Sequence, residues 1–192
     1  MDEVTCLKKR RWRMDKLSEK HWGRFRIGDL FQIRIGKNID GNKADMTGDI
    51  AYVTRKETNN GIDGFINGKN VLLNKDFPVI TIGNETAKPY VQQYPFFTGT
   101  KVNILKPYSK VSFYALQFVA TSLQQHKDKY SYSYTTNSTR LKEQIILLPI
   151  TESGVPDWAF MDAFMRQKEQ KVLKPAVEKL CKRLIHKEIL GG

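Results

Sequence analysis

The C-terminal segment constrains the fold of this chain most, because its apolar residues recur at helical spacing from about position 157 toward position 190. Charged residues fill the gaps, and Pro156 and Asp157 suit the first turn of a helix. Pro175 lacks an amide hydrogen and clashes with the preceding turn, so we expect it to interrupt or kink the segment. The apolar positions are Phe160, Met161, Phe164, Met165, Val172, Leu173, Val177, Leu180, Leu184, Ile185 and Ile189.

The length of this segment and its two-sided apolar stripe exceed what one small domain needs. We therefore expect an arm that packs against another helix, either of a second copy of the chain or of a partner protein. The alternative is a C-terminal helix that folds back onto the chain's own sheet. The predicted contacts of the partner or dimer helix are Phe160, Phe164, Leu173, Val177, Leu180 and Leu184.

The preceding residues have a different period, with short apolar or alternating runs separated by turn residues. Runs with strand character occur within residues 25–36, 50–54, 71–73, 79–82, 90–93, 101–105 and 144–150. Their spacing of roughly ten residues is typical of a small twisted sheet or partial barrel. Residues 111–125 return to helical spacing, with Ser109 or Ser112 as the cap. The predicted fold class is α+β: a β-rich domain with flanking helices, followed by a long C-terminal helix.

We divide the chain into a basic lead at residues 1–22, a β-rich domain at residues 23–155 and a helical arm at residues 156–192. The first 26 residues hold nine Lys or Arg against four acids, without a clear period. This stretch could contact phosphates, or it could be a solvated charged segment.

The net charge of +12 at pH 7 is large for 192 residues and attracts polyanions. Nucleic acid is the leading candidate partner, because phosphate neutralisation supplies most non-specific affinity. A membrane surface is not expected, since no helix carries aromatic residues opposite a lysine face. A soluble protein with an incidental basic surface remains the alternative. No apolar run approaches a membrane span, and Cys6 and Cys181 form neither a metal spacing nor a disulfide framework, so we expect a cytoplasmic protein.

One predicted loop combines cations with amides that suit the edges of DNA bases. Arginine recognises guanine O6 and N7, and asparagine recognises adenine N6 and N7, so the loop is suited to a major groove. The residues are Arg55, Lys56, Asn59 and Asn60. The alternative is a plain hairpin turn, in which Asn59, Asn60 and Gly61 supply a left-handed backbone. Both interpretations can hold together.

A second stretch, residues 127–142, mixes hydroxyl and amide side chains with lysine and arginine, as phosphate ligands do. We expect Lys129, Tyr132, Tyr134, Thr136 and Arg140 to lie near double-stranded DNA. Lys37 and Lys142 are expected to bind phosphates. The alternating tyrosines are equally typical of an edge strand with one packed face.

The sequence contains no recognisable motif for catalysis. His21, His126 and His186 are scattered and have no partnered nucleophile, and no glycine-rich phosphate loop occurs. The Asn-Pro-Pro-Tyr or Asp-Pro-Pro-Tyr sequence of adenine-modifying methyltransferases is also absent from the printed sequence. We therefore expect no catalytic residue, metal site or cofactor in this chain. Two alternatives stay open, a small metal-dependent nuclease and a protein–protein adaptor.

The order of these pieces resembles the specificity subunit of type I restriction–modification systems and of the related Bcg-like enzymes. The resemblance covers about residues 23 to 190. It rests on the stretches at residues 25–33, 36–37, 50–55, 59–62, 80–83, 96–97, 114–116 and 147–150. These include Phe-Arg-Ile-Gly-Asp-Leu-Phe-Gln-Ile near the start and Leu-Leu-Pro-Ile shortly before the long helix.

This resemblance implies a chain that selects a DNA sequence while partner subunits do the chemistry. In that family, target-recognition domains are joined to long helices that dock methyltransferase subunits, which bind S-adenosylmethionine and methylate adenine, and restriction subunits, which cut. The Phe-x-Ile-Gly-Asp-Leu-Phe stretch and the Leu-Pro element are expected to be mainly scaffold. A full specificity subunit has two recognition domains, and this sequence has one, so we expect a half-length subunit that pairs with a copy of itself, or a fragment.

Overall fold

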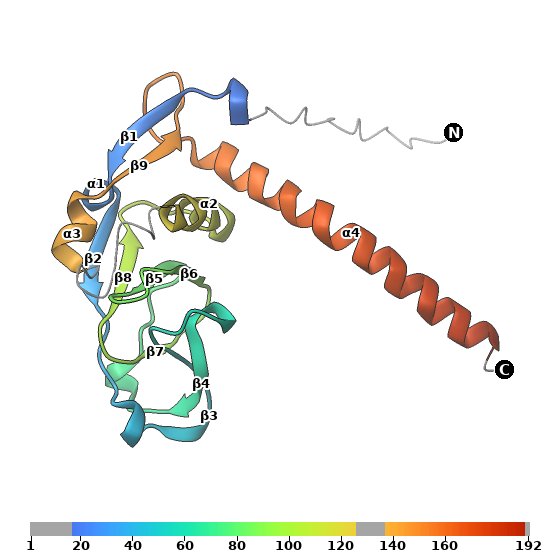
Figure 1. Ribbon diagram of the computed structural model, residues 1–192, viewed down its shortest axis with the longest axis horizontal. Coiled ribbons are helices and arrows are strands. Elements are labelled where there is room, and N and C mark those ends of the chain that lie inside the picture. The colour runs from blue at the N-terminus through green and yellow to red at the C-terminus, as the bar shows by residue number, and fades with distance from the viewer. Residues whose placement is uncertain (1–16, 126–136, 191–192) are drawn as a thin grey trace, which may run out of the picture.

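The computed structural model describes residues 17–125 and 137–190, with the backbone alone at residue 182 and from residue 184 onward (Figure 1). The α-helices of the described residues are α1 (Ile27–Leu30), α2 (Phe113–Gln124), α3 (Ser138–Glu143) and α4 (Trp158–Leu190). The strands are β1 (Trp22–Arg26), β2 (Phe31–Ile35), β3 (Asp45–Val53), β4 (Ile62–Asn67), β5 (Val79–Gly83), β6 (Pro89–Gln92), β7 (Phe97–Thr98), β8 (Val102–Pro107) and β9 (Ile145–Pro149). Short 3₁₀ turns are η1 (Leu17–Glu19), η2 (Gly41–Lys43), η3 (Asn59–Gly61) and η4 (Asn70–Leu72).

The centre of the domain is a four-stranded antiparallel sheet in the order β2-β8-β5-β6. Because side chains alternate along a strand, both faces of its inner strands are apolar. Ile80 and Leu105 pair across β5 and β8 and pack on one face with α2. Val79 and Ile104 lie on the other face, in a cluster with Val53 of β3. The sheet is therefore buried on both sides.

A second sheet, in the order β4-β3-β7, covers that other face. Its main part is the antiparallel β3–β4 hairpin, to which β7 adds in parallel. Tyr52 is buried and donates its hydroxyl hydrogen to the carbonyl of Ile39 at 2.7 Å. Ile66 and Phe97 complete a small cluster that also holds the loops on either side of the hairpin.

A two-stranded ribbon, β1 with β9, joins the domain to the C-terminal helix. Ile27 and Phe31, from the stretch expected to be scaffold, are fully buried, as is Leu148 of the Leu-Pro element. Gly28 lets α1 approach α3 closely, because a Cβ there would lie 3.0 Å from the carbonyl oxygen of Lys142.

The long helix α4 packs only its first turns on the domain and then extends away from it (Figure 1). Asp157 caps it by accepting the amide of Phe160 at 2.9 Å. Met161 is fully buried beside α2, whereas the side chains of residues 168–181 are all exposed. The expectation of a long helix after a β-rich domain is confirmed. None of the helices in the described residues has the length and apolar character needed to cross a membrane.

Two predictions about elements were wrong. Residues 71–73 were expected to form a strand, but η4 occupies residues 70–72, because this run passes over a small cluster instead of pairing with a neighbour. Pro175 was expected to interrupt or kink the last helix, and the interruption does not occur, because α4 continues through position 175. The helix is exposed there, so water can reach the carbonyl that loses its amide partner. The sheets of the described residues form no closed barrel.

Candidate nucleic-acid interface

The recognition loop, residues 54–61 between β3 and β4, is held in a fixed conformation by its backbone. Asn59, Asn60 and Gly61 have φ values of 50°, 56° and 76°. Asparagine and glycine tolerate this left-handed region best, so the turn interpretation of these residues is confirmed. The amide of Thr54 donates to the carbonyl of Gly61 at 2.8 Å and closes the loop.

The two cations of the recognition loop are paired with acids. Arg55 donates to the carboxylate of Glu85, which also lies 3.5 Å from Lys101. Lys56 lies 2.9 Å from Asp63. The acid partners orient these cations, and both side chains remain 38% exposed. Gly83 permits the approach of the loop, because a Cβ there would lie 2.9 Å from the Cα of Arg55.

The two asparagines of the recognition loop have different roles. Asn60 donates its side-chain amide to the carbonyl of Val91, and Gln92 donates back to the carbonyl of Asn60 at 3.0 Å. Asn60 therefore fastens the loop to β6. Asn59 is exposed and its side chain makes no hydrogen bond to the described part of the chain. Of the two, Asn59 is the one available to a ligand.

The second predicted group lies at the opposite edge of the central sheet. Arg140 and Lys142 belong to α3, which packs against α1 and the edge strand β2, while η3 packs against β6 at the other edge. Asn137 caps α3 by accepting the amide of Arg140 at 2.9 Å. Lys142 is exposed. The predicted contacts Lys129, Tyr132, Tyr134 and Thr136 lie outside the described residues.

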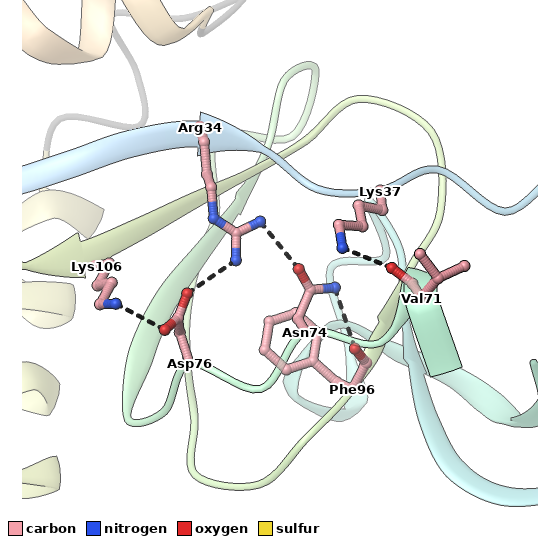
Figure 2. A network of polar contacts seen from close by, with 7 residues as sticks. All are labelled: Arg34, Lys37, Val71, Asn74, Asp76, Phe96 and Lys106. Atoms are coloured by element: carbon pink, nitrogen blue, oxygen red, sulfur yellow. Dashed lines mark hydrogen bonds and ion pairs between the residues drawn. The ribbon is translucent and has the colours of Figure 1, made fainter. Parts of the chain in front are cut away.

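Lys37, the other predicted phosphate ligand, borders a cleft of about 350 Å³ at the end of β2. We call it the Arg34 cleft. It is lined by Arg34, Lys37, Asn70, Val71, Leu73, Asn74, Lys75 and Asp76. Figure 2 shows the Arg34 side chain directed toward Asn74 and Asp76, and Lys37 directed toward the carbonyl of Val71, which accepts from its Nζ at 2.5 Å.

The carboxylate of Asp76 organises the cations of this cleft (Figure 2). Its two oxygens accept from Lys106 at 2.7 Å and from Arg34 at 3.2 Å. The hydrogen bond from Lys106, and then that from Arg34, hold the pKa of Asp76 below its usual value despite partial burial. Asn74 is buried and fixes Arg34 from the other side at 3.0 Å, while its own amide donates to the carbonyl of Phe96.

Sequence reasoning missed Arg34, Lys75 and Lys106. The alternation of β2 directs Arg34 to the face opposite the buried Ile33 and offers the one available signal, a cation between two isoleucines of a strand. Nothing in the sequence indicates that Asp76, more than forty residues later, meets Arg34.

The base of α4 is locked to α2 by polar contacts. Asp162 accepts from Ser112 at 2.5 Å and from Arg166 at 2.7 Å. Burial pushes the pKa of Asp162 upward, but the hydrogen bonds from Arg166 and Ser112 outweigh it and hold that pKa below its usual value. Tyr114 donates to Glu169 at 2.5 Å, two turns beyond Asp162 along the helix. These contacts fix the direction in which the arm leaves the domain.

The residues predicted to contact a partner or second copy fall into two groups, one packed on the domain and one exposed farther along α4. Phe160 and Phe164 pack against the chain's own core, and Phe164 lies edge-on to Phe118. This corrects the expectation that both face a partner, because the first turns of α4 lie on α2. Leu173, Val177 and Leu180 are 50%, 55% and 57% exposed, on the part of α4 that touches nothing in the described chain. The side chain of Leu184 lies outside the described residues.

Among the described residues, no group of three or more His, Cys, Asp or Glu side chains could hold a metal ion.

Comparison with known proteins identifies the family of this chain. A family model for the type I restriction modification DNA specificity domain matches residues 19–175. The specificity subunit S.BcgI of a type II restriction enzyme from Heyndrickxia coagulans is 49% identical over 143 residues, which are 73% of this chain and 42% of that protein.

Solved structures show a similar fold. The S subunit of a type I restriction-modification system from M. genitalium has a TM-score of 0.61 at 15% identity, over 93% of this chain and 46% of that one. The HsdS subunit from Thermoanaerobacter tengcongensis has a TM-score of 0.56 at 15% identity, over 80% of this chain and 38% of that one. The chain therefore spans less than half the length of each of these relatives.

Proposed function

Because this chain belongs to the type I restriction modification DNA specificity family, we propose that it recognises a sequence in double-stranded DNA and brings partner subunits to that site. The recognition loop is the observation that carries the proposal. Its rigid backbone holds Arg55, Lys56 and the exposed Asn59 together, and arginine and asparagine are the side chains that distinguish guanine and adenine in the major groove.

In this proposal the chain selects the site and the partners carry out the chemistry. A methyltransferase subunit would bind S-adenosylmethionine, and a restriction subunit would cut where one is present. The exposed stripe of Leu173, Val177 and Leu180 supports a docking role for α4, since apolar residues at helical spacing are what a second helix packs against.

We extend the proposal to pairing between two copies of the chain. The region that this chain matches is less than half of each relative, and the described residues hold one β-rich domain. Two copies joined through α4 would present two recognition loops and would bind a split site with two-fold symmetry.

Selection from a pool of randomised duplexes tests the proposal. The full chain is incubated with the pool at low salt, and bound duplexes are recovered and amplified over several rounds. We expect convergence on one motif. A pool that stays random contradicts sequence recognition, and plasmid cleavage by sub-stoichiometric chain with magnesium contradicts the non-catalytic role.

Two substitutions then separate base contacts from phosphate contacts. Arg55→Ala should relax preference at one base pair and cost about 1–3 kcal/mol there. Arg55→Lys keeps a cation beside Glu85 but cannot form the bidentate contact, so it should lose the same preference. Lys142→Ala should weaken binding to all sequences alike and reduce the salt slope by about one. Equal behaviour of the Arg55 and Lys142 variants would show that this assignment is wrong.

A further inference from the structure

The Arg34 cleft holds more cationic side chains than the packing of the domain requires. Arg34, Lys37, Lys75 and Lys106 lie in or beside it, against the single carboxylate of Asp76. Lys75 is exposed and forms no hydrogen bond or ion pair with the part of the chain that the structure describes. Packing the domain needs the Arg34 and Lys106 contacts with Asp76, but it does not need Lys75.

We infer that the Arg34 cleft binds a phosphodiester group of the DNA backbone. The inference rests on the proposed function and adds to it the surface that holds the duplex in register. Contacts of this kind position a protein on DNA without reading its sequence.

The cleft is arranged for an anion before any ligand arrives. Asp76 and Asn74 together hold the guanidinium of Arg34, and these contacts use two of its N–H donors out of five. Lys37 uses one donor on the carbonyl of Val71 and has others to offer. The donors therefore converge on one cleft with little side-chain freedom left to lose, which lowers the entropic cost of binding.

The position of the cleft relative to the recognition loop fits one duplex. Residues of η4, which follows β4, line the cleft, whereas the recognition loop joins the other end of the β3–β4 hairpin. The six residues of β4, which pair along the whole of β3, separate the two ends, a span of roughly 20 Å at strand geometry. A helical turn of DNA is about 34 Å long, so a base contact and a backbone contact can fall within one turn.

The surroundings favour a polymer over a small anionic metabolite. The cleft is at the lower end of the volumes that hold small molecules, and further lysines lie beyond it. Lys43 ends η2 and Lys69 precedes η4; both are exposed, and the loops that carry them pack on the same apolar cluster. Lys142 lies along the same edge strand, β2, on α3. Several exposed cations outside the cleft suit the successive phosphates of a strand better than one small anion.

Salt dependence of binding by the full chain tests the inference. Lys75→Ala and the double variant Lys37→Ala/Lys75→Ala are compared with Lys174→Ala, which removes the same charge from the exposed part of α4. We expect the slope of log affinity against log salt to fall by about 0.9 for each phosphate contact removed, and to stay unchanged in the control. The loss should be equal on the selected duplex and on a scrambled one. Lys75 has no hydrogen-bond or ion-pair partner among the described residues, so thermal unfolding of the Lys75→Ala variant should match that of the unchanged chain.

The outcomes separate this inference from the proposed function. If the unchanged chain selects a motif but the cleft variants keep its salt slope, the cleft does not bind phosphate and the proposed function stands. If the variants instead lose the preference for the selected motif, the cleft reads bases and the inference is wrong. If the unchanged chain selects no motif, the proposed function itself fails, whatever the variants do.

Discussion

At the scale of single residues, Asp162 shows how one carboxylate sets the direction of the arm. It accepts hydrogen bonds from Ser112 of the α2 cap and from Arg166 on its own helix. The Ser112 hydroxyl also accepts the amide of Ala115, so one serine caps α2 and ties it to α4. Arg166 in turn lies over the ring of Tyr114, 4.2 Å from its centre.

We predict that Asp162→Asn loosens this junction in a pH-dependent way. The variant loses charge-assisted hydrogen bonds and should cost about 1–2 kcal/mol of unfolding free energy near neutral pH. The folded pKa of Asp162 is depressed, so its stabilisation is present above the usual value of 3.8 and is lost as the pH falls through the lower folded value. Urea unfolding of both proteins between about pH 6 and about pH 3 should show the difference shrinking with acid. A difference that stays constant over this range would show that the Asp162 charge is not its cause.

The structural role of a residue could be predicted from the sequence where it depends only on the neighbouring backbone. Ser112 as a cap and the left-handed Asn59 and Asn60 follow from rules that act within a few positions. The partners of Arg55 and Arg34 did not follow, since Glu85 and Asp76 are brought to them by sheet pairing between distant segments. Whether a cation is free to bind DNA depends on such acid partners. The sequence alone therefore could not show which cations of the candidate site are available to DNA.

At the scale of elements, the spacing of apolar residues predicted whether a segment is a helix or a strand, but it did not predict which strands pair. The strands β5, β6, β8 and β9 and the helices α2 and α4 occur where alternation or helical spacing predicted them. The order β2-β8-β5-β6 was not predictable, because the apolar runs of β5 and β8 are suited to several neighbours. The separation of the recognition loop from α3 is a consequence of this order.

Pro175 offers a prediction at this scale, because it lies within an exposed stretch of α4. Pro175→Ala restores an amide hydrogen and removes the ring clash, which together disfavour a helix by about 3 kcal/mol. We expect slower hydrogen exchange of the amides around position 175 and higher helicity by circular dichroism. The melting of the β-rich domain should not change, since no buried side chain is altered. Unchanged exchange around position 175 would show that the helix is already fully formed there without the extra bond.

At the scale of the whole molecule, the β-rich domain and the outer part of α4 are physically separate. The domain is held by three apolar clusters, and α4 joins the largest of them only through its first turns, up to Met165. The hydrogen bond from Tyr114 extends this attachment to Glu169. The stripe of Leu173, Val177 and Leu180 farther along the helix is exposed, so DNA binding by the domain and partner docking by the helix can be abolished independently.

Ending the chain after Gln170 tests this separation, because it keeps the contacts of Asp162, Arg166 and Glu169 with α2 and removes the exposed stripe of Leu173, Val177 and Leu180. The unfolding free energy of the domain should change by less than about 1 kcal/mol, as for other surface changes. The deletion removes six Lys or Arg and two Glu, which lowers the net charge from +12 to +8. Binding should therefore be compared near 0.15 M salt, where charges beyond about 8 Å are screened. We expect the shortened chain to keep the selected motif and the salt slope set by the Arg34 cleft, and to run as a monomer in light scattering where the full chain self-associates. A shortened chain that still self-associates would place the pairing surface on the domain, and one that loses the motif would show that two copies must be joined before either reads DNA.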